Sequence, residues 1–243
     1  MRDLSVIIPT WCEADAIACA VQRAAAIGDE VIVADAASPD GTAQLARAAG
    51  ALVVSSGKGR GAQLHAGARA AHCDTLLFLH ADVILPRAAR AAIEAALSDP
   101  EVAGGNFYLR FVPETPAARF YSWANDARRR WLDVYYGDSA LFIRRSAYEA
   151  LGGFRALPIF EDYELVRRLE RGYRTKYVRD VQLEASARRF ADAPLKTLAV
   201  WTALHSLYWL GVPAHRLASL YHDLRPVGAA SIQPRERVNE GRP

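Results

Sequence analysis

Histidine and aspartate stand two positions apart at the end of a hydrophobic run, in LLFLHADVILP at 76–86. Carboxylates at such a place often hold a metal ion or a phosphate, but here an imidazole, that of His80, comes first. Mg²⁺ and Mn²⁺ prefer oxygen ligands and usually keep several waters, so Asp82 with two phosphate oxygens of a ligand suffices for a metal site. His80 can hydrogen-bond a hydroxyl or accept Mn²⁺. A second interpretation of His80 stays open, in which it is only the polar end of a strand.

Glycines alternate with basic residues in GKGRG at 57–61, directly before a helix-like segment. Glycine lets a ligand approach the backbone closely, and the N-terminus of a helix attracts anions. Lys58 and Arg60 add positive charge to this loop. The stretch therefore favours an anion-binding loop over a surface loop with incidental charges.

Two adjacent acids, Glu161 and Asp162, lie near the start of the helix-like segment at 159–172. Acids in a first turn often only complement the helix dipole. A carboxylate can also act as a general base when it lies beside a substrate hydroxyl. The residue types alone leave both interpretations open.

Short apolar runs alternate with helical segments through the first hundred residues, and these elements must position the polar residues. Continuous apolar runs indicate strands that are buried on both faces. Strands that alternate with helices of this length predict parallel βαβ units in an α/β fold with an open sheet. We expect the strands at 4–9, 30–35, 51–56 and 75–80.

Four polar clusters follow these expected strands. Ligands of open α/β sheets bind at the carboxyl ends of the strands, so the four clusters predict one shared site. The clusters are Thr10 to Glu13, Asp35 to Gly41, Gly57 to Gly61, and His80 to Asp82.

The second half of the chain mixes strands with longer helices. We expect a strand with alternating exposure at 104–111, helices at 115–131 and 159–172, a strand and a short helix within 135–154, and one or two strands within 177–190. Two further helices at 194–223 are broken near 211–213. The polar tail from 226 onward is expected to be mobile.

Composition limits the functions that are open to the chain. Its 243 residues are 51% hydrophobic and 23% charged, which suits one globular domain. The formal net charge of +3 comes from scattered residues and does not favour nucleic-acid binding. Three cysteines without a C-x-x-C pair indicate a reduced, cytoplasmic chain and no structural zinc. We expect neither a signal peptide nor a transmembrane segment.

The turn after the first expected strand reads PTWCEADAI and holds no glycine. Dinucleotide-binding folds and many methyltransferases place a glycine-rich turn at this point, and so do sugar-phosphate nucleotidyltransferases. The sequence therefore disfavours all three classes. It leaves a parallel sheet that binds its nucleotide by other means.

Five motifs occur in order within residues 4 to 222 and resemble those of a family 2 glycosyltransferase with the GT-A fold. They are VIIPTWCEADAI, DAASPDGT, GKGRGAQLHAGA, LFLHAD and YGDSALFIRRSAYEALGGFRALPIFEDYELVRRL. More narrowly, they are similar to the branch named radical-SAM/selenodomain-associated transferase 2. The resemblance implies one GT-A domain over 1–225, followed by a disordered tail at 226–243. Its parts are a nucleotide-sugar-binding half at 1–112, an acceptor and catalytic half at 113–190, and C-terminal helices at 191–225.

On the nucleotide side, the resemblance places Thr10 and Glu13 along the base and ribose of a nucleotide-sugar. A capping box at the start of a helix is the alternative for this pair. Asp35 would accept a hydrogen bond from the imide N–H of uracil, since an ionised carboxylate only accepts. We expect the turn after Asp35 to form without it, because Ser38 to Gly41 carry turn chemistry of their own.

The same resemblance gives Lys58 and Arg60 contacts with the nucleotide. His80 and Asp82 take the place of an Asp-x-Asp motif, which binds the ribose and, through Mg²⁺ or Mn²⁺, the diphosphate. Asp82 matches the acid that faces the metal. His205, on a helix rich in Trp and Tyr, is either a further metal ligand or a histidine of the core, and we favour the core.

On the catalytic side, the resemblance assigns the base to Asp162, with Glu161 as the second choice. Related enzymes place residues near the acceptor or the diphosphate at positions that correspond to Gly137, Asp138, Arg188 and Arg189. The last two belong to SARRF, which only loosely resembles the Q-x-x-R-W motif of processive synthases. Polymer synthesis is therefore not expected.

These roles imply an inverting, metal-assisted transfer from a nucleotide-diphosphate sugar to a small-molecule or lipid-linked acceptor. An acid at Asp35 suits a UDP-sugar, and a GDP-sugar stays open. Two other classes stay open as well: a nucleotidyltransferase acting on a small phosphate, and a nucleotide-binding module without turnover. The aromatic C-terminal segment is expected to pack on the domain or on a second copy in a homodimer, with a peripheral membrane contact as the alternative.

Overall fold

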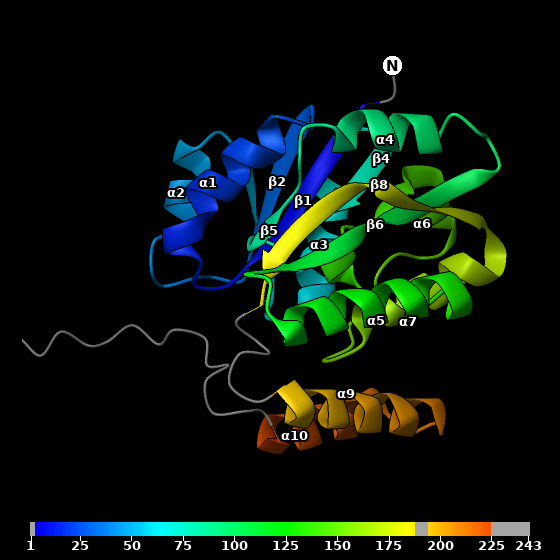
Figure 1. The fold of residues 1–243 in the computed structure, drawn as a ribbon. Coiled ribbons are helices and arrows are strands. Elements are labelled where there is room, and N and C mark those ends of the chain that lie inside the picture. Colours follow the sequence, from blue (N-terminus) through cyan, green and yellow to red (C-terminus); the bar gives the residue numbers. More distant parts are fainter. Residues whose placement is uncertain (1–2, 188–193, 225–243) are drawn as a thin grey trace, which may run out of the picture.

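A mixed eight-stranded sheet forms the centre of the molecule (Figure 1). The computed structural model describes residues 3–187 and 194–224. The strand order across the sheet is β3-β2-β1-β4-β7-β6-β8-β5. The neighbours among β3, β2, β1 and β4 are parallel, as are β6 and β8, whereas β7 and β5 run antiparallel to the strands beside them. The expected α/β fold with a mostly parallel sheet is confirmed.

The elements follow the expected order along the chain. The strands are β1 (Leu4–Thr10), β2 (Glu30–Asp35), β3 (Leu52–Ser55), β4 (Thr75–Phe78), β5 (Val83–Ile84), β6 (Val102–Val112), β7 (Phe142–Arg144) and β8 (Arg174–Ser186). The α-helices are α1 (Ala14–Ala25), α2 (Thr42–Ala48), α3 (Arg60–Ala70), α4 (Ala89–Ala96), α5 (Pro116–Leu132), α6 (Arg145–Ala150), α7 (Glu161–Gly172), α9 (Pro194–Trp209) and α10 (Ala214–Leu224). A 3-10 helix, η1, spans Gly137–Ser139. Each of the first four strands ends within two residues of its expected end.

Two hydrophobic cores fill the two faces of the sheet, because side chains alternate along a strand. Val6 and Ile8 of β1 join the core that also holds residues of α1, α2 and α4. Ile7, between them, joins the core shared with α3, α6 and α7. Burial of such a side chain contributes about 1.5–3 kcal/mol. The central strands are therefore held between two helix layers, which fixes their carboxyl ends in space.

The sequence pattern was less complete for β6 and β8. β6 begins at Val102, and its exposure alternates only from Phe107 onward, because the residues before it are buried on both faces of the sheet. The segment expected to form one or two strands forms the single strand β8, which begins before the expected range. The tail from 226 onward lies outside the described residues.

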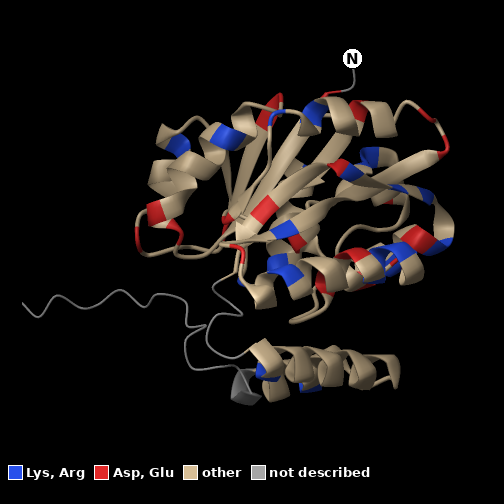
Figure 2. Cartoon of the chain, in the orientation of Figure 1, with Lys and Arg blue, Asp and Glu red and all other residues tan. Residues whose placement is uncertain are grey.

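α9 and α10 form a hairpin that lies beside α5 in Figure 1 and carries few charged residues in Figure 2. A third hydrophobic cluster joins the hairpin to the start of α7 and includes Phe160, Tyr163, Leu204 and Leu217. The indole N–H of Trp209 also donates to the hydroxyl of Tyr163 at 2.6 Å. The expected packing of the C-terminal helices on the domain is therefore present. Among the described residues, no helix has the length and apolar character needed to cross a membrane.

Candidate active site

The carboxyl ends of β3, β2, β1 and β4 lie next to one another at one edge of the sheet. Thr10, the last residue of β1, is in register with Asp35, the last residue of β2. Asp35 is in turn in register with Ser55 at the end of β3. The polar clusters that follow these strands therefore start from neighbouring positions, as the parallel topology requires.

Asp35 is buried and holds its own turn together. Its Oδ2 accepts the backbone N–H of Ser38 at 2.8 Å, and its Oδ1 accepts the hydroxyls of Ser38 at 2.6 Å and Thr10 at 3.0 Å. The expectation that the turn forms without Asp35 is wrong, because its carboxylate is the acceptor that closes the turn. An ionised carboxylate has about four acceptor positions, so one further N–H can still bind.

Thr10 and Glu13 do not form the capping box that was the alternative for this pair. Glu13 is the N-cap of α1 and makes no side-chain capping bond. Asp40, after β2, accepts the N–H of Ala14 in the first turn of α1 at 3.1 Å instead. Glu13 donates its own N–H to Thr42 Oγ1 at 2.9 Å. The loops after β1 and β2 are thus tied into one unit.

Lys58, in the loop before α3, and Arg60, the first residue of α3, have different partners. The ammonium group of Lys58 lies 3.7 Å from the centre of the Trp11 ring. Nη1 of Arg60 lies 3.6 Å from Oε1 of Glu161. The two cations therefore face different sides of the site, one near the end of β1 and the other near the start of α7.

Gly61 explains why α3 and α7 start so close together. A Cβ added at Gly61 would lie 2.6 Å from the carbonyl oxygen of Arg155 and 3.0 Å from Cβ of Glu161. This glycine therefore serves helix packing rather than the approach of a ligand. An added Cβ at Gly57 or Gly59 has no atom within 4 Å, which leaves that part of the loop open.

Asp162 is buried in the first turn of α7 and accepts two backbone N–H groups. Gly137 donates to its Oδ2 and Tyr163 to its Oδ1, each at 2.7 Å. A Cβ at Gly137 would lie 3.2 Å from Nε2 of His80 and 3.3 Å from Oδ2 of Asp162. The segment after β4, the turn before β7 and the start of α7 therefore meet around Gly137.

Glu161 is buried beside Asp162, and its charge is poorly balanced. Burial and the charge of Asp162 raise the pKa of Glu161 to about 7, although Arg60 acts in the opposite direction. The Arg60 side chain is 45% exposed, so solvent screens its attraction. Glu161 therefore lies between its acid and carboxylate forms near neutral pH, as groups that exchange protons with substrates often do.

The carboxylates of Asp82 and Glu13 are close enough to interact through their charges. Burial raises the pKa of Glu13, and the charges of Asp82 and Asp40 raise it further, so a cation here would relieve repulsion. Oxygen ligands suit Mg²⁺ or Mn²⁺, which can complete their shells with phosphate oxygens and water. Within the described ranges, no three His, Cys, Asp or Glu side chains are grouped to hold a metal by themselves.

His205 lies in the aromatic cluster of α9. Its Nδ1 donates to the carbonyl oxygen of Trp201 at 2.9 Å, and its Nε2 accepts from the hydroxyl of Tyr136 at 2.5 Å, roles that we assign from the partners. Burial lowers the pKa of His205, which favours this neutral ring. Both nitrogens are engaged, as expected for a histidine that packs among aromatic side chains, and the role of His205 as a metal ligand stays a prediction.

Of the other residues expected near the acceptor, only Asp138 lies within the described residues. Asp138 is half-buried in η1, directly after Gly137. Arg188 and Arg189 lie outside the described residues, so their roles stay predictions.

The sequence matches the family described as Glycosyl transferase family 2 over residues 5–156, which is more than half of the chain. The chain belongs to glycosyl transferase family 2. The matched range contains all four strand-end clusters and Gly137. It stops before α7, so Glu161 and Asp162 lie beyond it. A comparison with curated protein sequences finds no match.

Solved glycosyltransferases share the GT-A fold of this family 2 chain. A mannosyltransferase from Pyrobaculum calidifontis is 23% identical with a TM-score of 0.63, over 85% of this chain and 64% of that chain. Glucosyl-3-phosphoglycerate synthase from M. tuberculosis is 22% identical with a TM-score of 0.59, over 87% and 82%. Mannosyl-3-phosphoglycerate synthase from Rubrobacter xylanophilus is 16% identical with a TM-score of 0.53, over 86% and 75%. This chain thus spans less than two thirds of the mannosyltransferase.

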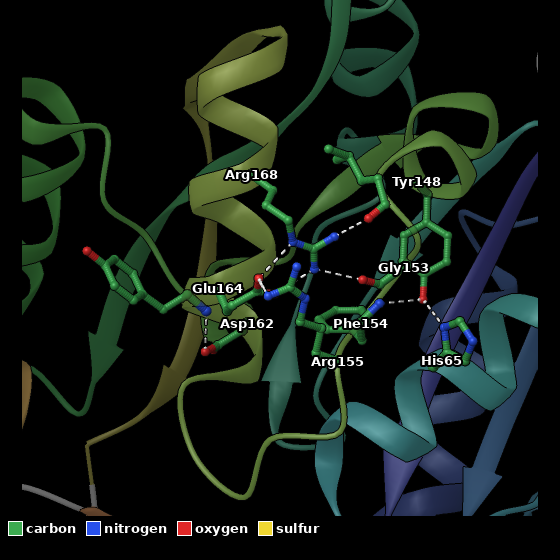
Figure 3. A network of polar contacts seen from close by, with 10 residues as sticks. His65, Tyr148, Gly153, Phe154, Arg155, Asp162, Glu164 and Arg168 are labelled. Atoms are coloured by element: carbon green, nitrogen blue, oxygen red, sulfur yellow. Dashed lines mark hydrogen bonds and ion pairs between the residues drawn. The ribbon is translucent and has the colours of Figure 1, made fainter. Parts of the chain in front are cut away.

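Polar contacts fix the loop that leads into α7 of this glycosyltransferase (Figure 3). Nε of Arg168 donates to Glu164 at 2.9 Å, and its Nη2 donates to the carbonyl oxygen of Gly153 at 2.8 Å. Arg155 forms a second ion pair with Glu164 at 3.1 Å. The loop is therefore anchored to the helix that carries Asp162.

Tyr148 holds the same loop from the side of α3 (Figure 3). Its hydroxyl accepts the backbone N–H of Phe154 at 3.2 Å and lies 3.0 Å from Nδ1 of His65. α3, α6 and the loop are thereby joined. The contacts around Asp162 thus join residues from His65 to Arg168 along the chain.

Gln63 builds the site but was not singled out in the sequence. It is buried on α3, and its Nε2 donates to the carbonyl oxygens of Thr10 at 2.7 Å and Ala34 at 3.1 Å. It therefore links the ends of β1 and β2 beneath the polar loops. A signal was present, because a glutamine on the buried face of a helix must find partners.

Proposed function

We propose that this family 2 glycosyltransferase moves a sugar from a UDP-sugar to a hydroxyl group of a small-molecule or lipid-linked acceptor, with inversion. Asp162 takes the proton of the acceptor hydroxyl while the oxygen attacks the anomeric carbon. The bond from that carbon to the acceptor oxygen forms as its bond to the diphosphate breaks. The nucleoside diphosphate leaves with the bonding electron pair.

The observation that carries the proposal is the meeting of His80, Gly137 and Asp162 at the carboxyl end of the parallel strands. A general base must lie within hydrogen-bond reach of the hydroxyl it serves. Asp162 is held in place by two backbone N–H groups, and its neighbour Glu161 forms an ion pair with Arg60 at the start of α3. Its position after GGF and at a helix start agrees with the acid that family resemblance assigns as the base.

The buried carboxylate of Asp35 supports uracil as the base of the donor. Its Oδ2 accepts only the N–H of Ser38 among the described residues, and an imide N–H can use the remaining position. Thr10 and Glu13 border the same place and would contact the base and ribose. Similar solved structures hold UDP with Mn²⁺ or Mg²⁺, or GDP-Man with Mn²⁺, so donors of both kinds belong in the assay.

Asp82 and Glu13 would hold a divalent cation against the diphosphate of the donor. When bound, Mg²⁺ or Mn²⁺ supplies positive charge to the leaving diphosphate. Lys58 before α3 and Arg60 at its first position would add positive charge. His80 replaces the first acid of the motif, and its imidazole would hydrogen-bond a ribose hydroxyl.

We extend the proposal to the finer assignments that the sequence suggested. The five motifs assign the chain to the radical-SAM/selenodomain-associated transferase 2 branch, and its three free cysteines suit a cytoplasmic location. A division into a nucleotide-sugar-binding half at 1–112 and a catalytic half at 113–190 agrees with the position of β1 to β4 in the first and Asp162 in the second. Arg188 and Arg189 would act near the diphosphate or acceptor. The α9–α10 hairpin would supply the contact for a homodimer or a membrane surface.

Release of nucleoside diphosphate from a panel of UDP- and GDP-sugars tests the proposal. We expect at least one UDP-sugar to be turned over with Mn²⁺ or Mg²⁺ and the rate to fall when EDTA removes the metal. Calorimetry with UDP and Mn²⁺ is the companion measurement. Binding of UDP without turnover of any donor would replace the enzyme with a nucleotide-binding module.

A further inference from the structure

Arg128, on α5, presents a guanidinium group whose partners are unusual for a half-buried arginine. Its Cζ lies 4.5 Å from the centre of the Tyr136 ring, and its Nη2 donates to Oδ1 of Asn125. Its Nε is buried and has no hydrogen-bond partner in the part of the chain that the structure describes. The group is thus held in place by an aromatic face and a neutral amide, while part of its hydrogen-bonding capacity is unused.

The two arginines that follow on α5 show the contrast. The buried Arg129 forms an ion pair with Glu170 at 3.3 Å, and Arg130 forms one with Asp126 at 3.7 Å. Among the residues that the structure describes, no carboxylate lies within ion-pair distance of Arg128. A half-buried cation without such a partner is costly in the free protein, and an incoming anion would remove that cost.

Tyr136 connects this arginine to the catalytic side. Gly137, the next residue, donates its N–H to Asp162. Burial raises the pKa of Tyr136, with Arg128 opposing this effect and the charges of Asp162 and Asp138 adding to it. A positive group and the proposed base therefore lie close to the same tyrosine.

A cavity of about 10 Å³ borders the guanidinium and is lined by Arg128, Tyr136, Asp138 and Ser139, among others. Such a volume holds about one water molecule. The main part of an acceptor must therefore lie outside it, with a small charged group directed toward Arg128.

We propose that Arg128 binds an anionic group, a carboxylate or a phosphate, of the acceptor whose hydroxyl is presented to Asp162. Guanidinium groups suit this role because they bind carboxylate and phosphate oxygens through paired, charge-assisted hydrogen bonds. The proposal rests on the proposed function for the role of the hydroxyl, but the binding of the anion can be measured separately.

Calorimetry with glycerol 3-phosphate, glycerate and glycerol measures the binding directly, without donor. We expect an anion to bind wild type and Arg128→Ala to bind it at least about tenfold more weakly, the size of a lost charge-assisted contact. Glycerol should bind neither protein measurably. Arg119→Ala is the matched control, since Arg119 is an exposed arginine of the same helix. Equal weakening by both variants, or weakening by Arg119→Ala alone, overturns the proposal.

Asn125→Asp tests the same site without truncating the arginine. The variant places a carboxylate against Nη2 of Arg128 at constant size, so it should compete with the anion and weaken its binding by a similar factor. Retained thermal unfolding and retained UDP binding show that each variant is folded. If Arg128→Ala does not fold, anion binding by Asn125→Asp that equals that of wild type overturns the proposal.

Vesicles separate a lipid-linked anion from a free one. Phosphatidylcholine vesicles with and without phosphatidic acid serve as the lipid probe, and co-sedimentation is the measurement. Binding that requires phosphatidic acid and Arg128 supports a lipid source, whereas Arg128-dependent binding of the soluble anions supports a free acceptor. Binding that does not depend on Arg128 in either arm contradicts the proposal.

Turnover distinguishes failure of this proposal from failure of the proposed function. Donor hydrolysis, in which water replaces the acceptor, is measured for wild type and Arg128→Ala as the reference rate of each protein. Transfer to an anionic acceptor should show a raised KM in the variant. If donor turnover does not depend on Arg128 with any acceptor, the proposed function stands and the anion site is contradicted. If anion binding depends on Arg128 but no donor is turned over, the anion site stands and the proposed function is contradicted.

Discussion

The carboxylates in the first turn of α7 have different surroundings from Asp35, which lies at the end of β2. Asp35 receives three hydrogen bonds, two from Ser38 in its own turn and one from Thr10 at the end of β1. Glu161 is equally buried, but its charged partner is a half-exposed arginine at 3.6 Å, and another acid follows it. The first region is satisfied by its own residues, whereas the second keeps two adjacent acids in a place where charge is costly.

This difference separates binding from chemistry. A loop that positions a nucleotide gains from rigidity, and local hydrogen bonds supply it before any ligand arrives. A site that moves protons gains from groups whose protonation is finely balanced, and burial with a like charge produces that balance. We therefore expect substitutions in the first region to act on stability and substitutions in the second to act on turnover.

Asp162→Asn should give the largest effect on turnover. An amide cannot take the acceptor proton, so we expect transfer to fall by about 10²- to 10⁴-fold, the range of general base catalysis. The measurement is product formation with the best donor and Mn²⁺. UDP binding should change little, since the substitution leaves the nucleotide-side loops intact. Equal turnover by variant and wild type would remove Asp162 from the role of base.

Asp35→Ala should lower stability most within the nucleotide-side loops. It leaves the N–H and hydroxyl of the half-buried Ser38 and the hydroxyl of the buried Thr10 without their acceptor. An unsatisfied group costs about 1–3 kcal/mol when it is buried, and less where water reaches it. Urea unfolding measures the loss. Asp180→Ala, at an exposed position, is the control and should change stability by less than about 0.5 kcal/mol. Similar values for both variants would contradict the account of this turn.

Glu161→Gln should remove a pH dependence of stability. The pKa of Glu161 is raised from 4.5 to about 7 in the folded protein, so the folded state holds this proton more tightly than the unfolded chain. Its stabilising contribution is complete below about pH 4.5 and is lost as the pH rises to about 7. Urea unfolding at about pH 5 and about pH 8 should show a smaller difference for Glu161→Gln than for wild type. An equal change in the free energy of unfolding between the two pH values for variant and wild type would show that the pKa of Glu161 is not raised.

Arg60→Ala should have the smallest effect on stability. Its ion pair with Glu161 is half-exposed and 3.6 Å long, and such pairs contribute about 0–1 kcal/mol. Turnover should fall more clearly, because the same arginine is proposed to face the nucleotide. The free energy of unfolding and kcat/KM, measured on one preparation, check both statements. If Arg60→Ala lost much stability and kept its turnover, Arg60 would be a structural residue and not a contact for the nucleotide.

The central strands could be predicted because their signal is local. Runs such as LSVIIP and EVIVAD are apolar on both faces, and alternation with helices then fixes a parallel order. The role of Asp35 in its turn was also visible, since Ser38 follows three positions later and can donate to it. We missed it because the other turn residues appeared sufficient.

The partner of Glu161 could not be predicted in the same way. Arg60 is about one hundred residues from Glu161, and only the packing of α3 against α7 at Gly61 brings them together. His205 shows the same limit, because its hydrogen bond to Tyr136 depends on how the α9–α10 hairpin packs on the domain.

The sequence by itself determined the strands, the order of the polar clusters and the acids at the start of α7, because these follow from short-range periodicity and from residue type. The tertiary structure decided which groups share charge, which histidine packs among aromatic rings and which arginine lacks an acidic partner among the described residues. Those properties depend on burial and on distances between segments far apart in the chain. Electrostatic interactions are set by these quantities rather than by spacing along the backbone.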